Sequence, residues 1–219
     1  MGFDVTFHPI GEKELRHFFF DVLADPTLAT ERAAELCPDA KKRKKVAQVY
    51  RALPQFVARR EPVTAFGVCA AIVSGFLHPY WYARGQAFSL LDRKQVPEVL
   101  GLFVPLGKLG SDILSKLSDP SDGRFLGNES ASGLIPADRI ARAEQLLEAL
   151  NTRPGPDALP ILATAFDEDG LESLRAALHY CRSNRLGMIE ASDVVVPIAD
   201  KCCTDESNLR APFLGKMEP

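Results

Sequence analysis

Apolar residues recur at helical spacing along most of the chain, and this periodicity favours a mainly helical fold. The clearest stripe lies between positions 46 and 57 and consists of Val46, Val49, Tyr50, Leu53, Phe56 and Val57. Pro54 interrupts this stripe, which predicts that the helix kinks or splits after Leu53. Similar patterns predict further helices over 11–23, 27–36, 111–117, 136–150, 158–166 and 171–185.

Few segments alternate in the manner of a strand. Residues 3–7 alternate apolar and polar side chains and predict a short strand. Residues 102–104 are expected to form a strand or an extended segment, and 194–196 a short strand or the start of a terminal helix. The aromatic stretch 63–91 predicts the heart of the core as two helices joined at His78-Pro79. The expected fold class is therefore mainly α, with a small strand pair as an α+β variant.

The chain is predicted to form a single globular domain over residues 1–219. Residues 152–156 (Thr-Arg-Pro-Gly-Pro) are the candidate internal junction, although a stretch this short more often joins two helices than two domains. Residues 118–136 are rich in Ser, Asp and Gly and are expected to form a loop.

The composition is that of a globular protein, with 46% hydrophobic and 25% charged residues, and it excludes wholesale disorder. The net charge of −3 conceals an asymmetry, because residues 1–118 carry +4 and residues 119–219 carry −7. An acidic part of this kind attracts basic proteins and repels nucleic acid. The basic run 41–45 could be an anion or nucleic-acid patch, but we interpret it as a solvated first helical turn, because no aromatic or glycine-rich segment accompanies it.

The five cysteines indicate a reducing compartment, and we expect a cytoplasmic location. Their number is odd and their spacing fits no disulfide framework. The adjacent Cys202 and Cys203 are poorly placed to bridge each other. The N-terminus lacks the pattern of a secretory signal, and the apolar run 65–77 is too short to span a membrane.

No complete catalytic, metal or cofactor motif is present, so the sequence favours a protein that is not an enzyme. The four histidines lack metal-ligand spacing. The alternative is a small enzyme or a binder of anionic ligands, with its site in the chemically dense segment 78–84: His78, Tyr80, Tyr82 and Arg84. There His78 would carry the proton and Arg84 would anchor the anion. The competing interpretation is a packed aromatic core.

The candidate partner-binding residues are carboxylates of the acidic part: Asp119, Asp122, Glu129, Asp167, Glu168, Asp169 and Glu172. Such patches speed the encounter with a basic protein. The loop 127–133 contains serines between glycines but matches neither a nucleophile elbow nor a phosphate loop, and we interpret it as a turn.

Three stretches support a resemblance: 1–10 (MGFDVTFHPI), 76–85 (FLHPYWYARG) and 127–140 (GNESASGLIPADRI). Together they resemble small cytosolic bacterial proteins of largely unknown function, some of which are similar to immunity proteins encoded beside secreted toxins. The resemblance implies a protein that binds a toxin and neutralises it without catalysis, with a basic toxin domain as partner, and it assigns no site residue.

Overall fold

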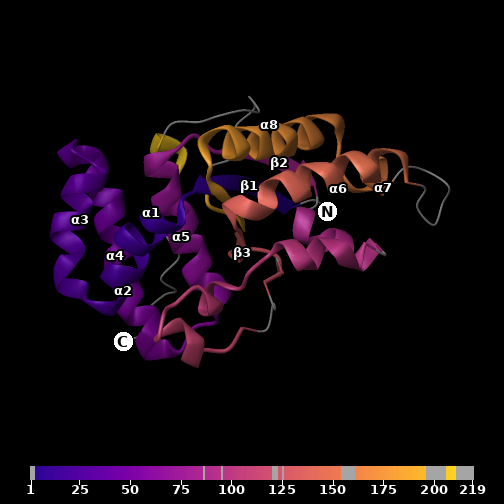
Figure 1. Ribbon diagram of the computed structural model, residues 1–219. Coiled ribbons are helices and arrows are strands. Elements are labelled where there is room, and N and C mark those ends of the chain that lie inside the picture. Colours follow the sequence, from indigo (N-terminus) through magenta and orange to yellow (C-terminus); the bar gives the residue numbers. More distant parts are fainter. Residues whose placement is uncertain are drawn as a thin grey trace.

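A small antiparallel sheet lies between two layers of helices (Figure 1). The computed structural model describes residues 3–85, 87–94, 96–119, 123–124, 126–153, 161–195 and 206–210. The strands are β1 (Phe3–Ile10), β2 (Trp81–Gly85), β3 (Ala131–Ile135) and β4 (Gly187–Ser192), in the order β2-β1-β4-β3. The expected mainly helical class is confirmed, and the expected strand pair is in fact a sheet of four strands.

Both faces of the sheet are buried. Alternation along β1 directs Val5 and Phe7 to one face, whereas Ile10 faces the other with its neighbours Thr6 and His8. Each face therefore contacts its own layer of helices and its own hydrophobic core.

The first layer is built from the N-terminal third of the chain (Figure 1, indigo to purple). It contains α1 (Glu12–Leu15), α2 (Asp21–Ala24), α3 (Ala29–Leu36), α4 (Ala40–Arg59) and α5 (Val63–Leu77). A π-helical turn joins α1 to α2, so the helix predicted over 11–23 is present. The predicted split after Leu53 is wrong, because α4 continues through Pro54. Pro54 is exposed, and the buried Leu53 and Phe56 hold the helix against the core on both sides of it.

The second layer covers the opposite face (Figure 1, α6–α8). It contains α6 (Ile140–Thr152), α7 (Ile161–Ala165) and α8 (Glu168–Asn184), as the periodicity predicted, and two 3-10 helices, Phe88–Lys94 and Pro97–Leu102. α6 and α8 pack side by side and are joined by the ion pairs Arg182–Glu144 (2.8 Å) and Arg175–Glu148 (3.4 Å). Of the candidate junction 152–156, residues 154–156 lie outside the described residues.

Three sequence expectations for the middle of the chain are wrong. The helix expected after His78-Pro79 is β2 followed by a 3-10 helix, because Trp81 and Tyr82 pack on opposite faces of the sheet. The expected loop 118–136 contains β3. The helix expected over 111–117 is a single 3-10 turn, Leu114–Lys116. Val104 and Val195 each form only an isolated bridge, with Leu134 and Leu209 respectively.

Glu190 joins the sheet to the second layer. It lies on the central strand β4 and is fully buried. Its Oε1 accepts a hydrogen bond from the amide of Phe88 (2.6 Å), and its Oε2 accepts one from the amide of Ser89 (3.0 Å). The carboxylate therefore caps the first turn of the 3-10 helix Phe88–Lys94.

Residues 206–210 pack against the first layer. Leu209 is almost fully buried there, and Gly75 of α5 leaves room for it, since a Cβ at Gly75 would lie 2.9 Å from Leu209 Cδ2. Among the described residues, no helix has both the length and the apolar character needed to cross a bilayer.

Candidate functional site

An open hollow of about 460 Å³ lies where α4 ends and α5 begins. One wall is apolar and comes from these two helices: Phe56, Pro62, Ala65, Val68 and Ile72. The facing wall is polar and comes from three distant segments: Asn128 and Glu129, Ser192 and Asp193, and Arg210. Arg59, Glu61 and Thr64 complete the lining. We call this feature the α4–α5 hollow, and its volume is within the range of ligand sites.

The backbone at the mouth of the α4–α5 hollow adopts unusual conformations. Arg60 ends α4 with φ of 56°, Glu129 has φ of 53° and Asp193 has φ of 58°. Among the described residues only Arg185 is a further non-glycine residue with positive φ. Arg60 is the left-handed residue with which helices commonly end, whereas left-handed backbone at Glu129 and Asp193 is unfavourable for residues with a side chain. The three sharp turns bring the end of α4, the loop before β3 and the end of β4 together.

Buried serines hold the polar wall in place. Ser130 Oγ donates to the carbonyl of Gly127 (2.6 Å) and accepts from the amides of Leu126 (3.1 Å) and Gly127 (3.0 Å). Ser192 Oγ donates to the same carbonyl (2.6 Å). The amide of Glu129 donates to Asp193 Oδ2 (3.1 Å). Residues 127–130 thus form a fixed turn, whereas 131–133, which the sequence interpretation also assigned to the turn, belong to β3. The serine hydroxyls of this segment are bonded to the backbone.

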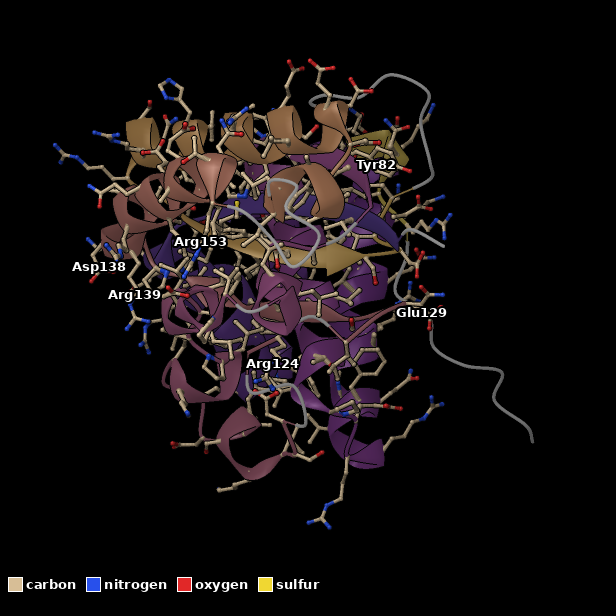
Figure 2. All side chains as sticks on the ribbon, turned by 90° about the vertical axis from the view of Figure 1, so that its right-hand side faces the viewer. Tyr82, Arg124, Glu129, Asp138, Arg139 and Arg153 are labelled. Atoms are coloured by element: carbon tan, nitrogen blue, oxygen red, sulfur yellow. The ribbon has the colours of Figure 1, made fainter. Side chains whose placement is uncertain are left out.

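The charges around the α4–α5 hollow are mixed, with a small excess of carboxylates. Glu61, Glu129 and Asp193 face two guanidinium groups, those of Arg59 and Arg210. Glu129 is exposed at the outer edge of the molecule, well below α8 (Figure 2). An apolar wall beneath a charged, solvated rim is suited to binding a complementary surface.

The aromatic segment 78–84 is occupied by contacts within the fold. His78 Nε2 lies 2.8 Å from Glu14 Oε2, and this hydrogen bond is the main reason that the pKa of Glu14 is lowered. Tyr80 is fully buried and stacks on His8, with ring centroids 5.2 Å apart. The hydroxyl of Tyr82 donates to Asp4 Oδ1.

The side chains of His78, Tyr80 and Tyr82 do not meet at one point. His78 follows α5, while Tyr80 and Tyr82 pack in the core of the first layer. Arg84 lies in β2 opposite Asp4. His78, Tyr80 and Tyr82 do not line the α4–α5 hollow. The arrangement matches the packed aromatic core that was the competing interpretation.

The predicted acidic residues are separated by the structure. Asp167 caps α8, since its Oδ1 accepts from the amide of Gly170 (2.7 Å), and Glu168, Asp169 and Glu172 follow within two turns. Carboxylates there are stabilised by the helix dipole, which gives them a local structural role. They belong to the second layer, whereas Glu129 lines the hollow beside α5 of the first layer.

The two remaining acidic candidates lie elsewhere. Asp119 follows Ser118, whose carbonyl accepts from the amide of Val63 at the start of α5. Asp122 lies outside the described residues. The acidic candidates therefore do not form one surface in the part of the chain that the structure describes.

Sequence reasoning found Glu129 but missed most of the α4–α5 hollow. Glu61, Asp193 and Arg210 are far apart in the sequence, and no spacing rule connects them. Charged residues beside the ends of strands or helices were the only sequence signal for this hollow.

No group of three His, Cys, Asp or Glu side chains in the described part of the chain is placed to hold a metal ion. Cys37, Cys69 and Cys181 are free and buried, and Cys202 and Cys203 lie outside the described residues. Comparison with protein-family models, with curated proteins and with solved structures found no match.

Proposed function

We propose that this chain is a non-catalytic binding protein whose protein partner docks on the α4–α5 hollow. The observation that carries the proposal is the preformed hollow itself, whose polar wall is fixed by the buried hydrogen bonds of Ser130 and Ser192. A rigid wall loses little conformational freedom when a partner binds, which favours a tight complex.

The partner we propose is a basic toxin domain, and the chain would act as its immunity protein in the cytoplasm. The charge of −7 in residues 119–219 and the excess of carboxylates around the hollow support a basic partner. The resemblance of residues 1–10, 76–85 and 127–140 to immunity-like proteins supports the biological class. The free, buried Cys37, Cys69 and Cys181 agree with a reducing compartment.

The test begins with the proteins encoded beside this chain in its source genome. Each is produced in a bacterial host with and without the chain, and growth is followed. We expect one neighbour to stop growth and the chain to restore it. His78→Ala is expected to protect as well as the original chain, whereas loss of protection with a normally folded protein would favour the enzyme alternative.

The docking surface is tested by the rate of association with that neighbour. Glu61→Lys combined with Glu129→Lys should slow association about tenfold at low salt, because both carboxylates line the hollow. Glu168→Lys combined with Glu172→Lys is the matched control on α8 and should change the rate little. The opposite pattern would place the interface on α8. If the original chain restored growth against none of the neighbouring proteins, the proposed function would be contradicted.

A further inference from the structure

The basic run at the start of α4 lines a second hollow, distinct from the α4–α5 hollow although residues 206–210 contribute to both. α4 begins after Asp39, whose Oδ1 accepts from the amides of Lys41 (2.8 Å) and Lys42 (3.5 Å). Cations in the first turns of a helix oppose its dipole, and like charges three and four residues apart repel each other. The run therefore costs stability, which a purely structural first turn does not require.

The five basic side chains do not point the same way. Arg43 turns back to the preceding loop, where Nε donates to the carbonyl of Cys37 (2.9 Å) and one Nη to that of Pro38 (2.7 Å). Lys42 and Lys45 instead contact Glu206 and Ser207. Lys42 pairs with the carboxylate of Glu206, and Lys45 Nζ donates to the carbonyls of Glu206 (3.1 Å) and Ser207 (3.0 Å).

These lysines surround a hollow of about 360 Å³, which we call the lysine hollow. It is lined by Lys41, Lys42, Lys44, Lys45, Gln48, Phe76, Glu206 and Ser207. The lining thus contains four lysines and a single carboxylate. Lys41 and Lys44 are exposed, and Glu206 is half-buried between the lysines and its own segment.

We propose that the lysine hollow binds an oligophosphate and that Glu206 occupies part of this site when no ligand is present. Lysine is a point-charge ligand for phosphate, and an oligophosphate brings several negative charges to a hollow with a local excess of positive charge. The carboxylate of Glu206 shows that an anionic group is accommodated in this hollow beside Lys42. An incoming phosphate would displace this carboxylate from Lys42, while Lys41 and Lys44 would contact the other phosphates.

The internal carboxylate gives the site a distinctive property. Because Glu206 competes with the ligand, its removal should strengthen binding instead of weakening it. We therefore expect Glu206→Gln to bind inorganic triphosphate about fivefold more tightly than the original chain, as for the loss of one competing exposed ion pair. Lys41→Ala and Lys44→Ala should each weaken binding about fivefold.

Isothermal titration calorimetry on the full chain tests the proposal, with inorganic triphosphate and ATP as probes at low salt. Lys116→Ala, which removes a lysine on a distant 3-10 turn, is the matched control and should bind as the original chain does. Added salt should weaken binding. Similar affinities for triphosphate and ATP support recognition of the phosphate chain, whereas binding of ATP without triphosphate overturns it.

The unfolding temperature of each variant identifies any loss that comes from misfolding. Removing Lys41 or Lys44 should not lower this temperature, since it relieves repulsion in the first turns of α4. No binding by either the original chain or Glu206→Gln would overturn the proposal. Equal affinities for Glu206→Gln, Lys41→Ala and the original chain would overturn it as well.

Discussion

Replacing Glu190 by glutamine should change how the stability of the protein depends on pH. The carboxylate is fully buried beneath the 3-10 helix Phe88–Lys94, and burial raises its pKa to about 7 although the amides of Phe88 and Ser89 bond to it. In the unfolded chain the pKa is 4.5. Glutamine has nearly the same shape and does not ionise in this range.

The sign follows from which state holds the proton. Below pH 4.5 the carboxyl of Glu190 is protonated in both states. Between pH 4.5 and about 7 the unfolded chain releases the proton while the folded protein keeps it, so the free energy of unfolding falls as the pH rises. Above that range both states are ionised and the loss is complete. The difference between the two pKa values corresponds to about 3 kcal/mol.

His8 acts in the opposite direction and makes a comparison of variants necessary. Burial lowers its pKa from 6.5 to about 3, so the unfolded chain takes up a proton below pH 6.5 and stability falls as the pH decreases. In the original chain this effect offsets that of Glu190 over much of the same range. Subtracting the unfolding free energy of the original chain from that of Glu190→Gln removes the His8 contribution.

Urea unfolding at several pH values between 4 and 8 measures this difference. Trp81 is the single tryptophan and is almost fully buried next to Tyr180, so its fluorescence reports unfolding. We expect Glu190→Gln to gain about 3 kcal/mol relative to the original chain between pH 4 and pH 8. The exposed Glu129→Gln serves as the control. A stability difference that does not change with pH would refute the reasoning. A difference that falls as the pH rises would show that the hydrogen bonds from the two amides lower the pKa of Glu190 more than burial raises it.

Three further predictions concern packing and reactivity. Gly133→Ala places a Cβ 2.4 Å from the carbonyl oxygen of Val104 and should cost about 1–3 kcal/mol in urea unfolding, whereas Gly101→Ala, with no atom within 4 Å of the new Cβ, should cost far less; equal effects would contradict this packing. Leu209→Ala should lower the unfolding free energy by about 2–5 kcal/mol and Leu126→Ala, at an exposed site, hardly at all; a neutral Leu209→Ala would show that residues 206–210 do not pack in solution. Burial raises the pKa of Cys69 to about 12 and also raises the pKa of Cys181. Iodoacetamide at pH 8 should therefore modify neither thiol until urea unfolds the protein, as measured by mass spectrometry of the peptides. Rapid labelling of either thiol in the folded protein would contradict their burial.

The sequence predicted the helices far better than the sheet. α4, α6 and α8 each bury one face, so their apolar stripes have helical spacing. β4 is buried on both faces and contains Glu190 and Ser192, whose polar groups are satisfied by hydrogen bonds within the fold. Such a strand neither alternates nor forms an apolar run, so its pattern gave no signal.

The α4–α5 hollow was predictable only in part, because its lining comes from segments that are far apart in the sequence. Glu129 was identified as one of the carboxylates in the acidic part of the sequence. Its neighbours Asp193 and Glu61 are brought to it by left-handed backbone at Asp193 and Arg60, and neither position is a glycine that would indicate such a turn. Pairing between distant strands then determines which turns meet.

The order of strands has a consequence for synthesis on the ribosome. β1 is translated first, but one of its two neighbours, β4, is translated more than 180 residues later, and their register joins Val5 to Ser192. Until β4 emerges, β1 can pair only with β2, and its other edge presents unpaired amides and carbonyls. A nascent chain would therefore carry an open strand edge through most of its elongation, which favours chaperone binding and slow, late completion of the sheet.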